Sequence, residues 1–139
     1  MARHRHRQPI VVDGANVAHE ELSSSGKPKV ANLVAMMREL ADRGYEPVVI
    51  VDASLWHEID DPDQLDAMIE RQQVRQVPAG TDADFFVLET AENLDAPVVS
   101  NDLFRNRRER YPWVRERRVP YMVVGGQIEL YEDAMARAG

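Results

Sequence analysis

The chain has 139 residues and a formal net charge of −7 at pH 7, and 44% of its residues are hydrophobic. This composition fits one globular domain and excludes a disordered chain. The sequence has no cysteine, which excludes disulfides, thiolate zinc sites and a cysteine nucleophile. A cysteine-free chain suits a reducing compartment, so we expect a cytoplasmic protein. No signal peptide or membrane span is expected, because Asp13 interrupts the first apolar stretch.

Short apolar runs rich in Val and Ile alternate with amphipathic stretches along the chain. The runs predict buried strands at residues 9–13, 47–52, 74–77, 97–100 and 119–124. Helical spacing of apolar residues predicts helices at about 30–41, 62–72 and 85–94. A hairpin at 125–126 and a short C-terminal helix follow. This alternation predicts a Rossmann-like, three-layer α/β/α domain with a central, mostly parallel sheet over residues 9–139, after a basic flexible tail at 1–8.

Two of the predicted strands end in a carboxylate. Asp13 follows the apolar run that opens the first strand, and Asp102 follows the fourth strand. Ligands of parallel sheets bind at the carboxyl ends of the strands, so both side chains are expected at one edge of the sheet. Each residue also has a structural interpretation, with Asp13 in an Asx turn made easy by Gly14 and Asp102 as the N-cap of a helix. Two matching strand ends favour a site.

A third carboxylate is expected from the start of the helix at 85–94. Asp84 shares a helical face with the apolar side chains that must pack on the sheet, so it is expected near Asp13 and Asp102. Asp82 projects to another side and is the weaker candidate. Thr81 and Asp84 also have the spacing of a helix-capping arrangement, which is the structural alternative.

Three carboxylates without a matching lysine repel one another unless a cation lies between them. Oxygen ligands without cysteine or clustered histidine select Mg²⁺ or Mn²⁺, and either ion can activate a water for attack on a phosphate. Asn16 is expected to orient a carboxylate or to bind a water on the metal, while Gly14 lets the backbone turn sharply. The residues expected to support this site are Asp82, Ser100, Asn101 and Asn106.

Positive charge is concentrated near the C-terminal third of the chain. Residues 103–118 carry +5 and residues 1–8 carry +3, which leaves −15 for the remainder. This distribution fits a protein that meets a polyanion at one face, and a solvated, salt-bridged helix is the alternative. Tyr111 and Trp113 are either stacking platforms for unpaired bases or core residues. The side chains expected to bind backbone phosphates are Lys27, Arg105, Arg107, Arg108 and Arg110.

Three segments together resemble a known family. VVDGANVA at 11–18, DADFFVLETA at 82–91 and VVSNDLFRN at 98–106 are similar to the NYN domain of the Regnase-type CCCH zinc-finger ribonucleases, within the PIN-like nuclease superfamily. The resemblance extends from Pro9 to about Tyr131. It implies a metal-dependent endoribonuclease with a three-layer α/β fold.

Carried over residue by residue, the resemblance implies that Asp13, Asn16, Asp84 and Asp102 form the metal site. One departure is Asn106, where the family often has an aspartate, and this implies a missing or weakened ligand.

We therefore expect an endoribonuclease that depends on Mg²⁺ or Mn²⁺ and hydrolyses phosphodiester bonds of single-stranded or loop RNA. One alternative is a catalytically weakened RNA-binding NYN module. Another is a small α/β protein that uses Asp13 as a phosphoryl acceptor, although its fifth strand lacks the lysine that a receiver would have. RNA is the expected partner and a membrane is not, while a homodimer or a targeting partner is left open.

Overall fold

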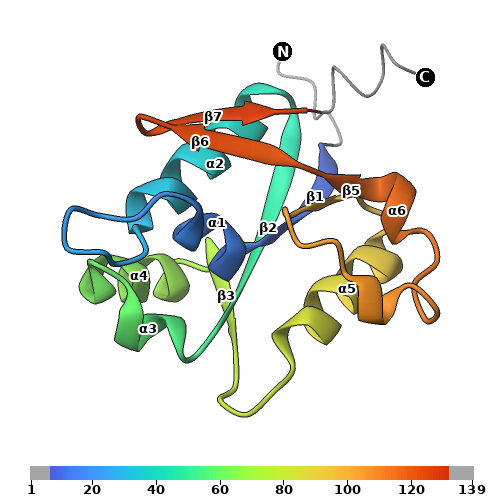
Figure 1. The fold of residues 1–139 in the computed structure, drawn as a ribbon, viewed down its shortest axis with the longest axis horizontal. Helices are drawn as coiled ribbons and strands as arrows, with labels where there is room; N and C mark the ends of the chain where they lie inside the picture. Colours follow the sequence, from blue (N-terminus) through green and yellow to red (C-terminus); the bar gives the residue numbers. More distant parts are fainter. Residues whose placement is uncertain (1–6, 132–139) are drawn as a thin grey trace, which may run out of the picture.

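The computed structural model describes residues 7–131, so the predicted C-terminal helix and most of the predicted basic tail lie outside the described residues. Strands and helices alternate along the chain in the way that the apolar runs predict (Figure 1). The strands are β1 (Gln8–Asp13), β2 (Tyr45–Asp52), β3 (Val74–Val77), β4 (Val98–Val99), β5 (Arg118–Val119), β6 (Tyr121–Val124) and β7 (Gln127–Leu130). The helices are α1 (Gly14–Glu20), α2 (Val30–Asp42), α3 (Leu55–Glu58), α4 (Pro62–Glu70), α5 (Ala83–Leu94), the 3₁₀ helix η1 (Arg105–Arg107) and α6 (Val114–Arg117).

Five strands form one parallel sheet in the order β3-β2-β1-β4-β5. The chain builds outward from β1 to β3 on one side and then returns to add β4 and β5 on the other side. The strand order therefore reverses between β1 and β4, which is where parallel α/β sheets bind their ligands. Asp13 is the last residue of β1, and Ser100 directly follows β4.

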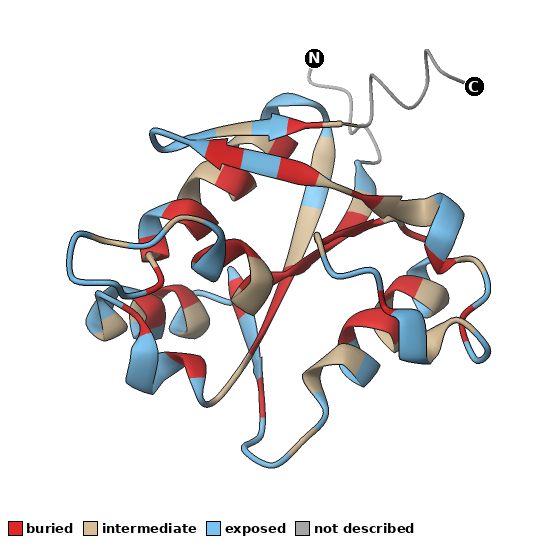
Figure 2. Cartoon of the chain, in the orientation of Figure 1, coloured by how far each residue is buried: buried red, intermediate tan, exposed pale blue. Residues whose placement is uncertain are grey.

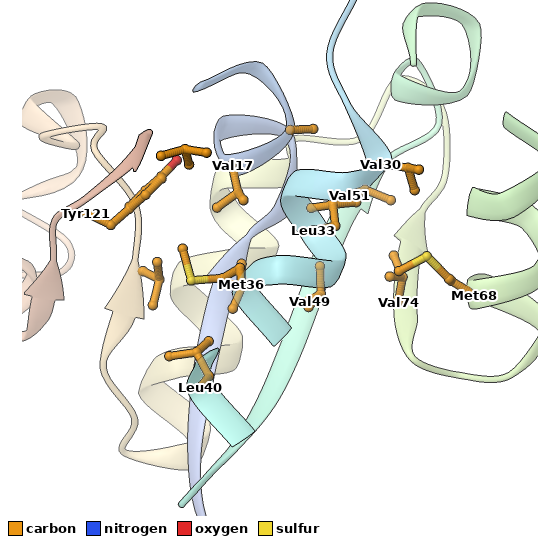
Figure 3. Close-up of a cluster of buried hydrophobic side chains, with 14 of the residues drawn as sticks. Val17, Val30, Leu33, Met36, Leu40, Val49, Val51, Met68, Val74 and Tyr121 are labelled. Carbon is orange, nitrogen blue, oxygen red and sulfur yellow. The ribbon is translucent and has the colours of Figure 1, made fainter. Parts of the chain in front are cut away.

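Helices cover both faces of this sheet, which confirms the predicted three-layer α/β/α fold. On one face, α1, α2, α3, α4 and the β6–β7 hairpin enclose the larger apolar cluster, which includes Val17, Leu33, Met36 and Tyr121 (Figure 3). On the other face, α5 and the segment 104–114 enclose a second cluster. The middle strands are buried between the two layers (Figure 2). In residues 7–131, no helix is long and apolar enough to cross a membrane.

The predicted strand at 119–124 is wrong in one respect, because the structure divides it at Pro120. β5 ends the parallel sheet, whereas β6 leaves it and pairs with β7 as an antiparallel hairpin. Pro120 has no backbone N–H to continue the ladder, so the chain changes partner there. The hairpin turn predicted at Gly125 and Gly126 is confirmed.

Gly14 is required for a different reason from the one that the sequence suggested. It is the first residue of α1, and its backbone has no positive φ. A Cβ atom at this position would lie 2.5 Å from Val51 Cγ1 and 2.8 Å from the Ile50 carbonyl oxygen. Glycine therefore allows α1 to start directly against β2, which places the residues after Asp13 close to the sheet edge.

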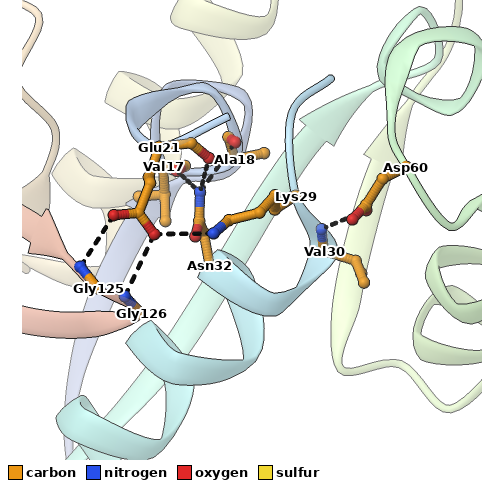
Figure 4. A network of polar contacts seen from close by, with 9 residues as sticks. All are labelled: Val17, Ala18, Glu21, Lys29, Val30, Asn32, Asp60, Gly125 and Gly126. Carbon is orange, nitrogen blue, oxygen red and sulfur yellow. Dashed lines mark hydrogen bonds and ion pairs between the residues drawn. The ribbon is translucent and has the colours of Figure 1, made fainter. Parts of the chain in front are cut away.

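Two polar side chains hold α1 and the hairpin in place (Figure 4). The buried Asn32 donates from Nδ2 to the carbonyl oxygens of Val17, Ala18 and Glu21 at the end of α1, at 3.3, 3.0 and 2.8 Å. The Glu21 carboxylate pairs with a lysine and accepts the two N–H groups of the hairpin turn at 2.9 and 3.2 Å. The helix that carries Asn16 and the hairpin that carries Tyr121 are thus fixed to one another.

Candidate active site

Asp13 lies at the carboxyl end of the central strand with only 8% of its surface exposed. The buried Ser100 hydroxyl donates to Asp13 Oδ2 at 2.9 Å and accepts the Asp102 N–H at 3.0 Å. Burial raises the pKa of Asp13 from its ordinary value of 3.8 to about 6. The Ser100 hydrogen bond acts in the opposite direction, whereas the charges of Asp84 and Asp102 raise the pKa further. Ser100 therefore links the two strand ends, as its predicted supporting role requires.

Asp84 and Asp102 line a hollow of about 250 Å³ beside this strand end. Asp84 is in the first turn of α5, and its charge acts on Asp13 at the sheet edge. Burial raises the pKa of Asp84, and the nearby Asp102 carboxylate adds to the rise. Asn106 lines the same hollow, with Arg105 and Arg107. The structure thus brings the three predicted carboxylates within electrostatic reach of one another.

Asp102 does not cap a helix, which corrects one structural interpretation of this residue. Its carboxylate accepts the Phe104 N–H at 2.8 Å in a local turn, and the next helix, η1, begins only at Arg105. The predicted Thr81–Asp84 capping arrangement is also wrong. Asp82 is the N-cap of α5 and accepts the Phe85 N–H at 3.2 Å, because it is one residue before the first helical residue.

Asn16 is held by two segments that are far away in the sequence. Its Oδ1 accepts the Asn101 N–H at 3.0 Å and the Tyr121 hydroxyl at 2.7 Å. Asn101 in turn exchanges two side-chain hydrogen bonds with the Tyr121 backbone, both at 3.0 Å. The carbonyl oxygen of the Asn16 side chain is therefore occupied, and its Nδ2 donors are the atoms that it can offer to a ligand.

The charges at this edge suit a hard cation, although the carboxylates do not form a closed cage. Within residues 7–131, no three side chains from His, Asp and Glu are grouped closely enough to hold a metal ion directly. No basic side chain of the described residues forms an ion pair with Asp13, Asp84 or Asp102. Carboxylate oxygens that lie apart fit an ion such as Mg²⁺, which keeps several of its waters, and the Arg107 charge offsets only part of the rise in the pKa of Asp84.

Much of the arginine-rich segment pairs with α5, as the salt-bridge alternative predicts. Arg107 pairs with Asp82, Arg110 with Glu89 and Glu92, and Arg117 with Asp95. The Arg107 guanidinium lowers the pKa of Asp82, so this carboxylate is committed to an ion pair.

Tyr111 and Trp113, the two aromatic residues considered for base stacking, pack in or against the core. Tyr111 is 1% exposed, packs in the second apolar cluster and donates its hydroxyl to Glu89 at 2.7 Å. Trp113 packs against the same cluster and donates to Glu92 at 3.2 Å. The core alternative is therefore confirmed for Tyr111, whereas Trp113 is partly buried and the Arg117 guanidinium lies 4.0 Å from the centroid of its ring.

Sequence reasoning missed two residues of this site. Asp52 ends β2 in the same way that Asp13 ends β1, and the run PVVIVD contained that signal. The Asp52 carboxylate accepts from Ser54 Oγ at 2.7 Å and from the Leu55 N–H at 3.1 Å, and its charge contributes to the raised pKa of Asp84. Tyr121 is the second residue, and no local pattern connects it to Asn16.

One predicted phosphate contact lies elsewhere. Lys27 is exposed in the connection between α1 and α2. In Figure 1 this connection lies on the left, whereas the arginine-rich segment around α6 lies on the right.

Comparisons with known proteins agree with the observed fold. The model of the Zc3h12a-like ribonuclease NYN domain matches residues 6–139. Two structures of nuclear protein-only RNase P 2 (PRORP2) from Arabidopsis thaliana are similar over 91% of this chain, with TM-scores of 0.69 and 0.70 at 20% and 22% identity. The chain spans 30% of the length of those proteins, so the likeness concerns the fold of one part of them. A search of curated proteins found no match.

Proposed function

The chain belongs to the family of Zc3h12a-like ribonuclease NYN domains, and on this basis we propose that it is an endoribonuclease that needs Mg²⁺ or Mn²⁺ and cleaves single-stranded or loop RNA. One observation carries the metal dependence. Asp13, Asp84 and Asp102 lie within electrostatic reach of one another. Burial and neighbouring carboxylates raise the pKa of Asp13 and of Asp84, although the Arg107 charge offsets part of the rise for Asp84. A divalent cation is the partner that would favour their ionised forms.

Asp13, Asp84 and Asp102 are the residues that would hold the ion. When bound, Mg²⁺ or Mn²⁺ supplies Lewis-acid chemistry, lowering the pKa of water and neutralising charge on phosphate oxygens. The protein prepares this site in two ways. Ser100 fixes the orientation of the Asp13 carboxylate, and its hydroxyl also holds the backbone of Asp102.

The RNA would be oriented by donors on either side of the carboxylates. Asn16 keeps its Nδ2 donors available because Tyr121 and Asn101 occupy its oxygen, so it can donate to a phosphate oxygen. Arg105 is exposed, lines the hollow with Asp102 and forms no ion pair within the described residues. Its guanidinium suits the phosphate next to the cleaved bond.

A catalytically weakened RNA-binding module is the second candidate, and Asn106 is the observation that favours it. Asn106 lines the hollow with Asp84 and Asp102, where an aspartate would add a further charge. A neutral amide offers an oxygen without a charge, which would weaken the hold on a cation.

Incubation of the purified protein with end-labelled single-stranded RNA separates the two candidates. We expect cleavage in Mg²⁺ or Mn²⁺, no cleavage in EDTA, and a loss of at least about 100-fold in Asp13→Asn. Asp95→Asn is the matched control, because it removes the same charge from an exposed residue at the other end of α5. Unchanged cleavage in Asp13→Asn would contradict the proposed site, and RNA binding without metal-dependent cleavage would support the second candidate.

A further inference from the structure

The arginines of the segment 103–118 fall into two groups in the structure. Arg107, Arg110 and Arg117 pair with carboxylates of α5 or its ends. The other four form no ion pair with any described residue, and of these Arg105 and Arg115 are exposed. Arg108 and Arg118 are the half-buried members without a carboxylate partner.

Arg108 and Arg118 come from two segments beside the candidate active site, because Arg108 directly follows η1, whose residues line the hollow, and Arg118 contacts the residue after β4. Arg118 donates from Nη1 to the Ser100 carbonyl oxygen at 3.0 Å, directly after β4. Burial lowers the pKa of Arg118, and the positive charge of Arg108 lowers it further, while Asp102 acts in the opposite direction. The charges of Arg108 and Asp102 therefore both act on the Arg118 guanidinium, which donates to a carbonyl oxygen.

This arrangement offers free donors to an anion. The Nε atom of Arg108 is buried and has no hydrogen-bond partner; the Nε of Arg117 is in the same condition, but the Arg117 guanidinium is already paired with Asp95. A buried donor without a partner costs free energy, and two like charges that lie near each other repel. An oxyanion between the guanidinium groups would accept from both of them and cancel their repulsion.

We propose that Arg108 and Arg118 bind one backbone phosphate of single-stranded RNA next to Asp102, and that the ion-paired arginines Arg107, Arg110 and Arg117 contribute little to RNA binding. The inference rests on the proposed function for the identity of the polyanion. The position beside Asp102 implies a phosphate close to the cleaved bond, because Asp102 also lines the hollow with Asp84.

Binding of a fluorescent single-stranded oligoribonucleotide in EDTA, where no cleavage is expected, tests this assignment. Arg108→Gln and Arg118→Gln should each weaken binding about tenfold and lower the slope of log affinity against log salt by about one. Arg110→Gln is the matched control, since it removes the same charge from an arginine already paired with Glu89 and Glu92. We expect less than about a twofold effect from it.

Equal losses in all three variants would overturn the proposal, because binding would then follow net charge alone. Thermal melting of each variant checks the fold. If Arg118→Gln does not fold, Arg108→Gln carries the test, because the Arg108 Nε has no internal hydrogen bond to lose. If Arg108→Gln binds the RNA as tightly as the wild type does and still cleaves it in the presence of metal, the assignment of a phosphate to Arg108 and Arg118 is wrong. The proposed function would stand. Selective loss of binding in a protein that never cleaves RNA would support this inference and contradict the proposed function.

Discussion

The buried carboxylate at the end of β1 should stabilise the metal-free protein less when it is ionised, so the contribution of Asp13 to stability should be smaller at neutral pH than at acidic pH. The folded-state pKa of Asp13 is about 6, against an ordinary value of 3.8. A raised pKa means that the folded protein binds this proton more tightly than the unfolded chain does. The stabilisation by the proton is therefore complete below about pH 4 and is lost as the pH rises through 6. Two pKa units correspond to about 3 kcal/mol at pH 7.

Asp13→Asn removes the charge and keeps an oxygen that can accept from Ser100. Because a buried amide still loses some hydration, we expect a gain of about 1–3 kcal/mol in the free energy of unfolding at pH 7 in EDTA. The difference in the free energy of unfolding between Asp13→Asn and the wild type should be near zero at pH 4 and should grow between pH 4 and 7. Urea unfolding followed by circular dichroism across this range measures it, with Asp95→Asn as the exposed control.

In EDTA the Asp13→Asn variant should be more stable than the wild type, and binding of Mg²⁺ should reverse this order. At a Mg²⁺ concentration about 100 times its dissociation constant, the wild type should gain about 2.7 kcal/mol. Asp13→Asn should gain much less, because it lacks the carboxylate nearest the reversal point of the sheet. A stability difference that does not change with pH would refute the reasoning from burial, and an equal response of both proteins to Mg²⁺ would refute Asp13 as a ligand.

Three further substitutions test other parts of the site. Asn106→Asp should lower the Mg²⁺ concentration needed for half-maximal cleavage, and identical titration curves would reject a metal-site role for this position. Gly14→Ala should destabilise the protein by about 1–3 kcal/mol, since the new Cβ would lie 2.8 Å from the Ile50 carbonyl oxygen, and unfolding in urea measures this. Tyr121→Phe should cost about 1 kcal/mol and lower kcat, because Asn16 loses one of the two groups that orient it; an unchanged kcat would show that the Asn101 bond suffices.

The fold and the positions of the acidic residues followed from local patterns in the sequence. A run of apolar residues as long as a strand, followed by a carboxylate, marks a strand end, and parallel strands bring such ends to one edge. Asp13 and Asp102 could be placed in this way, and Asp84 could be placed because helical periodicity identifies the face that packs on the sheet. The same rule would have found Asp52, which also ends a strand.

Other features depended on partners that no local pattern specifies. Asn16 is oriented by Tyr121, which is 105 residues away in the sequence, and Gly14 is required because β2 passes within van der Waals distance. The sequence placed seven arginines in one segment but could not separate those that pair with α5 from Arg108 and Arg118. Periodicity determines which face of an element is buried, whereas hydrogen bonds, ion pairs and close approaches between distant segments exist only after the layers have packed.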